Sequence, residues 1–306
     1  MLFMHDFLTT APFDVYELHL FHLVARHGSF TKAAEVASLT QSAVTRQVQG
    51  IERRLGLELF ERTTRSVRLT PAGSMLMKES ARLLGDVGHT LQRIREDFAN
   101  AKKEIRVGVS RSIGLAYMPG FFHANLKRLP QVGYRVSYQA SVDIVSAIER
   151  NELDVGVLCP PLRMPRTLRV THRFTDTFTL IGPANASPVL EPSFREGMLE
   201  WAARQYWLLI DEGTNTGKRL RIWMREQGLT VEPGLQLDSF DLIINLVALG
   251  MGVSFVPIRA LALYGTKQTL RRLPWPDRFV RELIVVVRRN RKIPGHLEQF
   301  IRNVLF

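Results

Sequence analysis

The 306-residue sequence is poor in cysteine, with Cys159 alone present. A single cysteine excludes an internal disulfide framework and a multi-cysteine zinc or iron–sulfur site. It also fits a reducing compartment. No G-x-S-x-G, Walker or G-x-G-x-x-G motif occurs, so the common nucleophile and nucleotide sites are not indicated either.

Long hydrophobic runs and a basic N-terminal flank are lacking too. The longest uncharged run lies between Asp241 and Arg259, and it is shorter than the ~20 residues that span a bilayer. The first 25 residues hold no Lys or Arg, so a secretory signal peptide is not indicated. The sequence therefore predicts a cytoplasmic protein without a membrane span, and we expect no metal and no cofactor.

Basic residues outnumber acidic residues by 41 to 29, for a formal net charge of +12. Such an excess often accompanies nucleic-acid binding, but here its distribution is uneven. Residues 1–104 carry a net charge of +2 and residues 105–306 a net charge of +10, of which Arg259–Phe306 holds +8. Total charge therefore identifies no DNA-binding region. Two roles stay open for the basic C-terminal segment: it forms an added DNA-facing surface, or its arginines are simply solvated.

Three zones follow one another along the chain. Residues 14–73 favour short helices with tight turns, and residues 74–103 favour one long helix. The apolar residues of the long helix recur on one stripe close to a coiled-coil seam: Leu76, Leu83, Val87, Leu91, Ile94, Phe98 and Ala101. Such a stripe predicts pairing with a second copy of the chain. The alternative is a helix that lies across the chain's own domain.

From residue 104 onward, β-branched runs alternate with helical patterns. This alternation predicts an α/β fold with parallel sheets and helices on both faces, large enough for two lobes with a cleft between them. The expected strands are Ile105–Val109, Tyr134–Tyr138, Leu153–Leu158, Thr177–Ile181, Trp207–Ile210, Val253–Val256 and Leu283–Arg288. The expected helices are Ile113–Arg128, Val142–Arg150, Glu191–Arg204, Gly217–Gln227, Phe240–Leu249 and Pro294–Phe306.

The stretch from Ser29 to Arg54 predicts two short helices joined by a tight turn. The first covers Thr31–Val36, and Thr40 caps the second at Gln41–Arg54. One face of the second helix is apolar, with Val44, Val48, Ile51 and Leu55. The opposite face is polar, with Gln41, Ser42, Thr45, Arg46, Gln49 and Arg53. A helix that enters a major groove needs such a face, although many solvated helix faces share it.

A Thr- and Arg-rich segment, Leu59–Thr70, follows the second helix. Its apolar residues flank a tip at Arg62–Ser66, which predicts a two-stranded wing. The arginines of this wing, Arg62, Arg65 and Arg68, could lie along phosphates or reach a minor groove. Between Arg26 and Arg68 there are 8 basic and 4 acidic residues, so this part of the chain is locally positive. Thr70 and Pro71 then supply an N-cap and a first-turn proline for the long helix.

Several short motifs stand in order along the N-terminal zone. They are Phe21, Ala25, Gly28-Ser29-Phe30, Ala33-Ala34, Leu39 to Val44, Ile51-Glu52, Leu55-Gly56, Leu59 to Arg62, and Thr70 to Gly73. A looser set continues with Val107-Gly108, Tyr117 to Pro119, Glu152 to Val157, and Gly250 to Pro257. With these motifs the chain resembles the LysR-type transcriptional regulators of bacteria, densely over roughly 60 residues and more loosely to its C-terminus.

The resemblance implies three domains. They are a winged helix-turn-helix DNA-binding domain (14–73), a linker and dimerisation helix (74–103), and a two-lobed effector domain similar to periplasmic binding proteins (104–306). Lobe I would cover about 104–162 and 266–306, and lobe II about 163–265. The implied function is a sequence-specific, DNA-binding transcriptional regulator whose activity changes when a small-molecule effector binds between the lobes. The implied partners are promoter DNA, a second copy through the linker helix, two further copies in a homotetramer, and RNA polymerase.

For DNA, the resemblance implies that Gln41, Ser42, Thr45 and Arg46 face bases, whereas Ser29, Thr31, Arg62 and Arg65 hold phosphates. Ser42 stands where many members have proline, and Thr45 where many have serine. Both positions stay polar, so a different sequence preference is expected while DNA binding is kept. Residues 1–13 receive no role.

For the effector, the resemblance implies a cleft bordered by the loop after the first strand and by strand ends of the second lobe. Ser110-Arg111-Ser112 precedes a helix start, where free N–H groups suit an anion, and the loop Gly213–Lys218 is also rich in donors. We expect effector contacts from Ser110, Arg111, Ser112, Cys159, Thr214, Asn215, Thr216 and Ser239, and an anionic effector such as a small organic acid. Plain helix capping is the alternative, and for Cys159 a small buried side chain.

Other functions stay open from the sequence. One is a solute-binding protein or an enzyme that uses the α/β domain, with the N-terminal part as an interaction module. Another is an architectural DNA binder without sequence preference. No nucleophile or activating base stands beside the carboxylate pairs Asp211-Glu212 and Asp238/Asp241, so we expect the chain not to be an enzyme.

Overall fold

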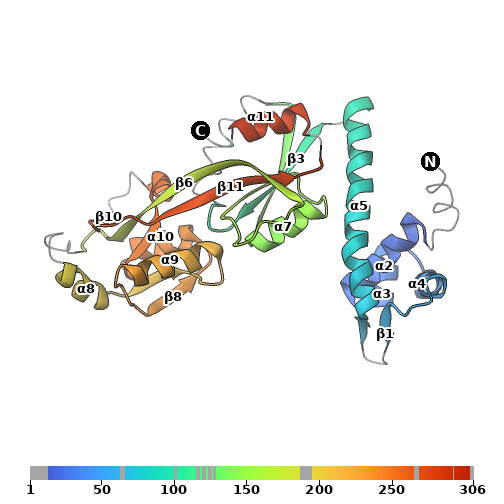
Figure 1. Ribbon diagram of the computed structural model, residues 1–306, viewed down its shortest axis with the longest axis horizontal. Helices are drawn as coiled ribbons and strands as arrows, with labels where there is room; N and C mark the ends of the chain where they lie inside the picture. Colours follow the sequence, from blue (N-terminus) through green and yellow to red (C-terminus); the bar gives the residue numbers. More distant parts are fainter. Residues whose placement is uncertain are drawn as a thin grey trace. The chain divides into compact units, whose positions relative to one another are not determined.

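The computed structural model describes residues 13–62, 66–99, 102–114, 118, 122, 126, 129–186, 195–264, 269–291 and 293–303. Its internal contacts divide the chain into two compact units, residues 1–99 and residues 100–306. Each unit is described by itself, with the element labels of Figure 1. Among the described residues, no helix has both the length and the apolar character that crossing a membrane requires.

The described part of the first unit holds three short helices, a hairpin and a long helix. Their bounds are α2 (Val15–His27), α3 (Phe30–Ala37), α4 (Gln41–Leu55), β1 (Phe60–Arg62), β2 (Val67–Leu69) and α5 (Pro71–Phe98). The two helices and the wing expected from the sequence are therefore confirmed. The long helix starts and ends a few residues before its predicted bounds of 74–103. Figure 1 shows α2, α3 and α4 gathered at one end of α5.

Side-chain caps fix where these helices begin. Ser29 accepts a hydrogen bond from the Lys32 N–H, and Thr40 accepts one from the Ala43 N–H at 3.2 Å. Thr70 does the same for the Gly73 N–H at 3.0 Å, with Pro71 in the first turn. Each cap satisfies an N–H group that has no partner within its helix.

The apolar faces of α2, α3 and α4 meet in one core. Val44, Val48 and Ile51 are fully buried, whereas Leu55, expected on the same face, is half-buried. Phe60 carries the hairpin into this core, with its ring centroid 5.3 Å from that of Phe21. The core therefore orients α4 and leaves its polar face outside.

The second unit alternates strands and helices as the sequence predicts. Its described elements are β3 (Lys103–Ser110), β4 (Val132–Gln139), α7 (Ser141–Glu149), β5 (Val155–Leu158), β6 (Leu168–Pro183), α8 (Arg195–Ala203), β7 (Trp207–Ile210), α9 (Asn215–Glu226), β8 (Pro233–Leu237), α10 (Phe240–Ala248), β9 (Ser254–Pro257), the 3₁₀ helix η1 (Ile258–Tyr264), β10 (Leu270–Leu273), β11 (Val280–Arg288) and α11 (Gly295–Asn303). The predicted helix Ile113–Arg128 and the start of the predicted helix Glu191–Arg204 lie largely outside the described residues.

The prediction of parallel sheets is right for only some of the strand pairs. A seven-stranded sheet has the order β10-β6-β11-β5-β3-β4, with β9 also beside β6. β3 is parallel to β4 and β5, but β11 is antiparallel to β5 and β6, and β6 is antiparallel to β9 and β10. Neither β6 nor β11 lies beside the strand that precedes it in sequence, so the local alternation of strands and helices does not fix the direction in which these two strands pair.

Two strands of the second unit are missed by the sequence analysis. β8 begins with Pro233-Gly234, two residues that disfavour strands, and pairs in parallel with β7. β10 has only four residues, and its two central residues are exposed arginines. Leu235, Gln236 and Leu237 of β8 do alternate, but Pro233-Gly234 hides the signal, and the Leu-Arg-Arg-Leu sequence of β10 shows neither an apolar run nor an alternation.

Two main cores define two lobes within the second unit. The first-lobe core gathers side chains of β3, β5, β11 and α11, and the second-lobe core gathers side chains of β7, α9, α10 and β9. β6 reaches both cores, with Phe174 in the first and Phe178 in the second. β11 packs Leu283 in the first core, and Phe279, the residue just before β11, packs in the second. These two long strands therefore join the lobes (Figure 1).

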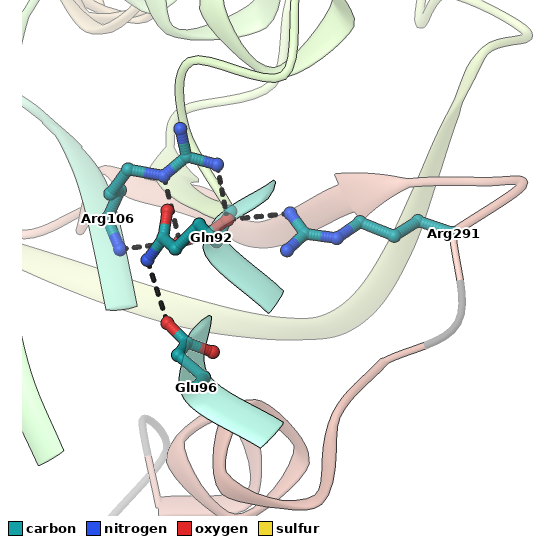
Figure 2. A network of polar contacts seen from close by, with 5 residues as sticks. Gln92, Glu96, Arg106 and Arg291 are labelled. Atoms are coloured by element: carbon teal, nitrogen blue, oxygen red, sulfur yellow. Dashed lines mark hydrogen bonds and ion pairs between the residues drawn. The ribbon is translucent and has the colours of Figure 1, made fainter. Parts of the chain in front are cut away.

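A charged cluster anchors the first lobe. The Asp154 carboxylate accepts hydrogen bonds from the Arg106 backbone N–H at 2.7 Å, from Arg106 Nη2 at 2.8 Å and from Arg291 Nη1 at 2.6 Å. Figure 2 shows both guanidinium groups reaching one carboxylate, and also the 2.8 Å hydrogen bond from Gln92 to Glu96 within α5. Burial by itself would raise the pKa of Asp154, but the hydrogen bonds and charges of the two arginines lower it overall.

We predict that Asp154→Asn lowers the free energy of unfolding by about 3–5 kcal/mol at neutral pH, because two arginines lose a buried partner. A lowered pKa in the folded state gives stability that is complete above the ordinary Asp value of about 3.9 and is lost as the pH falls through the folded value. Urea unfolding at pH 7 and pH 3 measures this, with the exposed Asp97→Asn as control. A difference that stays constant down to pH 2 would contradict the assignment.

Candidate functional site

The outer face of α4 is polar and open. Gln41, Ser42 and Arg46 are exposed, and Thr45 is half-buried. The Thr45 hydroxyl donates to the Gln41 carbonyl oxygen at 2.8 Å, and the Thr40 and Ser42 hydroxyls lie 3.1 Å apart. The first turn of α4 holds no acidic residue. Four predicted base-facing side chains therefore share one surface at the start of the helix.

Arg46 supplies a positive charge to this surface. Among the described residues it has no hydrogen-bond or ion-pair partner, whereas Arg54 on the same helix pairs with Glu17 at 2.6 Å. An unpaired guanidinium keeps its fork of donors available for base edges or phosphates.

Of the four predicted phosphate-holding residues, the structure describes Ser29, Thr31 and the backbone of Arg62. Ser29 is half-buried as the N-cap of α3, and Thr31 is exposed in the first turn of that helix. Arg62 ends β1, and Arg65 lies outside the described residues. The Glu52 carboxylate accepts from the Leu59 N–H at 2.9 Å and so ties the start of the hairpin to α4.

Behind the hairpin, the backbone of α5 lies very close. A Cβ atom at Gly73 would collide with the Leu59 carbonyl oxygen. Only glycine permits this approach, which explains why residue 73, in the first turn of the long helix, is a glycine.

In the second unit, the structure brings several predicted effector residues together across the two lobes. Ser112 follows β3 of the first lobe, and Thr216 lies in the first turn of α9 in the second. Their hydroxyl oxygens are 3.4 Å apart. Arg281 Nη1 donates to both, at 3.1 Å to Ser112 and 2.8 Å to Thr216. The two hydroxyls therefore accept from one guanidinium that touches both lobes.

Arg281 itself is fully buried and completely paired. Its Nε donates to Asp176 Oδ2 at 2.9 Å, and its Nη2 donates to the Ser112 carbonyl oxygen at 2.9 Å. The guanidinium carbon lies 5.2 Å from the Phe178 ring centroid and 5.5 Å from that of Phe240. Both charged side chains of the Arg281–Asp176 pair have no exposed area, so the charges persist only because they are paired.

A second bridge between the lobes is exposed. Arg111 Nη1 and Asp238 Oδ2 form an ion pair of 2.6 Å, and about half of each side chain is open to solvent. Close by in sequence, the Ser239 hydroxyl donates to Asp241 at 3.3 Å. Burial, and then the negative charge of Asp241, raise the pKa of Tyr138.

A third bridge involves Cys159. Asn215 Nδ2 donates to the Cys159 carbonyl oxygen at 3.1 Å, and Arg219 Nη1 lies 3.0 Å from the Cys159 sulfur. The thiol is buried, with 1% of the residue exposed. Thr214 is occupied in capping α9, since it accepts from the Gly217 N–H at 2.9 Å.

Ser110 makes none of these bridges. Its hydroxyl is buried and has no hydrogen-bond partner among the described residues. The predicted set therefore divides: Arg111, Ser112, Cys159, Asn215 and Thr216 link the lobes, whereas Ser110, Thr214 and Ser239 do not.

The sequence analysis missed Arg281, Asp176 and Arg219 as members of this region. A signal for the first two exists, because an arginine in the apolar strand Val280–Arg288 and an aspartate in the strand Leu168–Pro183 both need a partner when buried. Arg219 carries no such signal, because its position in the predicted helix Gly217–Gln227 falls on the exposed side, where an arginine needs no buried partner. Among the described residues, no group of His, Cys, Asp or Glu could hold a metal ion.

The comparisons with known proteins match both units. Residues 15–74 match the bacterial regulatory helix-turn-helix protein of the lysR family, and residues 99–305 match the LysR substrate binding domain. The HTH-type transcriptional regulator YofA of Bacillus velezensis is 28% identical over 263 residues, with 86% of this chain and 87% of that protein covered. The RuBisCO operon transcriptional regulator of Allochromatium vinosum is 27% identical over 294 residues, with 93% and 94% covered.

Solved structures share the fold. A full-length OxyR variant from Pseudomonas aeruginosa has a TM-score of 0.70 at 20% identity, with 95% of this chain and 94% of that chain covered. Full-length CbnR complexed with its target DNA has a TM-score of 0.69 at 18% identity, with 95% and 98% covered. The expected fold class, a helix-turn-helix unit followed by an α/β effector domain, is confirmed. The chain belongs to the LysR family and is a DNA-binding transcriptional regulator with an effector-binding domain.

Proposed function

We propose that the chain acts in the cytoplasm as a sequence-specific regulator, by binding and not by catalysis, with residues 14–73 as DNA-binding domain, 74–103 as linker and 104–306 as effector domain. Lobe I would comprise about 104–162 and 266–306, and lobe II about 163–265. The division between residues 99 and 100 and the two cores of the second unit support these bounds.

In this proposal α4 reads DNA through Gln41, Ser42, Thr45 and Arg46, and Ser29, Thr31, Arg62 and Arg65 hold phosphates. The observation that carries it is the exposed polar start of α4 with an unpaired Arg46, opposite a face buried in the core. Base edges in a major groove are read by short polar groups and by arginine near a helix N-terminus.

We expect Arg46→Ala to cost about 1–3 kcal/mol on the preferred site and to relax sequence discrimination, because a base contact is lost. Arg65→Ala should weaken binding to all DNA and reduce its salt dependence. Titrations on specific and random duplexes at several salt concentrations distinguish these effects. Arg204→Ala, which removes an exposed arginine from the second unit, serves as control. An unchanged site preference in Arg46→Ala would refute the base-reading role.

We further propose that α5 pairs with α5 of a second copy. This helix has 28 residues, about 40 Å of length, and leaves large apolar side chains uncovered. Leu83, Leu91, Ile94 and Phe98 are 48–85% exposed and recur on one stripe. Two copies would place two α4 helices on half-sites, and further pairing into a tetramer and contact with RNA polymerase would follow in the same assembly.

Leu91→Glu should turn dimers into monomers that bind half-sites poorly, because it puts a charge into the apolar stripe. Ser74→Glu adds the same charge at an exposed position of α5 outside the stripe and should leave the dimer intact. Sedimentation velocity of both variants gives the answer. Dimers of undiminished stability in Leu91→Glu would rule out this helix as the interface.

For the effector we propose an anion, such as a small organic acid, held between the lobes by Ser110, Arg111, Ser112, Cys159, Thr214, Asn215, Thr216 and Ser239. Arg281 donates to the Ser112 and Thr216 hydroxyls, and one of these hydroxyls can donate to the other, so the remaining hydroxyl hydrogen suits an acceptor group. The exposed Arg111 can exchange Asp238 for a ligand carboxylate.

A panel of acidic and neutral metabolites should raise the melting temperature of the full-length chain only with acidic members, since bound ligand stabilises the folded state. Arg111→Ala should reduce the shift without unfolding the protein, because its ion pair is solvent-exposed and worth little. If neutral compounds alone stabilised the chain, the anionic class would be wrong.

A further inference from the structure

The two-stranded wing formed by β1 and β2 is too small to hold its own position. Each strand has three residues, with Phe60 opposite Leu69 at the base. A two-stranded hairpin by itself is at best marginally stable in water. The direction in which the wing projects from the first unit therefore depends on the residues that hold its base.

Glu52 of α4 holds the start of the wing. Its Oε1 atom accepts the backbone N–H of Leu59 at 2.9 Å and that of Phe60 at 3.3 Å. Leu59 and Phe60 are at most 3% exposed, so their N–H groups have little access to water and need an acceptor within the protein. A carboxylate is a strong acceptor for them, because its hydrogen bonds are charge-assisted.

The backbone of Glu52 also closes α4. Its carbonyl oxygen accepts from the N–H of Gly56, which has a φ of +66°, and from the N–H of Leu57 at 3.1 Å. One residue therefore bonds to the turn that ends α4 and to the first strand of the wing. Glu52 thereby links the orientation of the wing to that of α4.

Thr70 holds the same segment from the side of α5. Its N–H donates to the Leu59 carbonyl oxygen at 3.0 Å, and its hydroxyl donates to the Glu58 carbonyl oxygen at 2.7 Å. Together with the close approach at Gly73, these bonds attach the base of the wing to α5. Glu52, in contrast, attaches it to α4, the helix with the exposed polar face.

The charge of Glu52 is unfavourable for the helix that carries it. Glu52 is the single acidic residue in the sequence of α4, which also holds Arg46, Arg53 and Arg54. A negative charge in the last turn is disfavoured by the partial negative charge at a helix C-terminus, and it repels DNA phosphates. The two backbone N–H groups give a physical reason for a carboxylate at this position.

We propose that Glu52 is a positioning residue for DNA binding. It holds the wing at a fixed orientation to α4, so that the wing arginines and the polar face of α4 contact one DNA duplex together. Groups that are oriented before binding lose less conformational entropy when the complex forms. This inference rests on the function proposed above, which assigns residues that touch DNA, and it adds a residue that acts through the wing.

A double-mutant cycle in the full-length chain tests this role, with the slope of log Kd against log salt concentration as the measurement. Arg68, exposed on β2, represents the wing. We expect Arg68→Ala to reduce the slope by about one when Glu52 is present, because one phosphate contact is lost. In Glu52→Ala the slope should already be lower, and adding Arg68→Ala should change it little. Arg46→Ala should keep its full effect on site preference in both backgrounds.

Control variants separate positioning from a general loss of stability. Glu58→Ala removes a carboxylate from the turn between α4 and the wing, where the side chain is exposed and accepts none of these bonds, and it should keep the Arg68 effect. Glu52→Gln retains an acceptor oxygen and should restore that effect. If Glu52→Ala does not fold, Glu52→Asp, whose side chain is one methylene shorter, takes its place in the cycle.

The possible outcomes are distinct. If Arg68→Ala reduces the slope equally with and without the Glu52 side chain, this proposal is overturned and the DNA-binding function stands. If the effects of Arg68→Ala and Arg46→Ala disappear together in Glu52→Ala, Glu52 supports the whole unit and the positioning role is again wrong. If Arg68→Ala has no effect in either background, the wing contact itself is refuted, and this role of Glu52 with it.

Discussion

The α/β unit depends on one buried charge, the guanidinium of Arg281. It lies on β11 directly opposite Asp176 on β6, the two strands that run between both cores. Each of its nitrogens is used, and its partners come from the loop after β3, from β6 and from α9. Since an unpaired buried charge is very costly, these partners must stay together for the unit to keep its form. Arg281 thereby holds Ser112 of the first lobe and Thr216 of the second next to each other.

This constraint changes how an effector is expected to act. Free opening of the lobes would break the bonds of Arg281 to Ser112 or Thr216 and leave its charge short of partners. The exposed Arg111–Asp238 ion pair, by contrast, contributes little stability, so a ligand carboxylate can replace Asp238 as the partner of Arg111. A ligand is therefore expected to change contacts at the edge of the inter-lobe region, with a shift between two closely related states. The DNA-reading unit has its own core and caps, so its recognition surface is formed without help from the second unit.

Much of this architecture was predictable from local sequence. The Thr40 cap, the apolar spacing of Val44, Val48 and Ile51, and Thr70-Pro71 each have a short-range physical cause, and the structure has them where they were expected. Strand direction was not predictable in the same way, because β6 and β11 pair with partners far away in sequence. The role of Arg281 depends on four separated segments meeting, although its presence in an apolar strand could have drawn attention.

The basic C-terminal segment illustrates the same limit. From composition, Arg259–Phe306 could be a DNA-facing surface or solvated arginines. In the structure Arg281 and Arg291 lie in ion pairs inside the fold, whereas Arg272 and Arg278 are exposed. The excess of basic residues in this segment therefore includes arginines paired inside the fold and arginines exposed on the surface. Only the tertiary contacts distinguish the two groups.

The central claim is that the polar face of α4 selects particular DNA sequences. The most direct measurement incubates the purified full-length chain with sheared fragments of its own genome in excess random DNA, and sequences the retained fragments. The account predicts a small set of enriched sites, bound ~10³-fold or more tightly than random DNA. Uniform retention of all fragments, or no retention at any salt concentration with or without small organic acids, would contradict it.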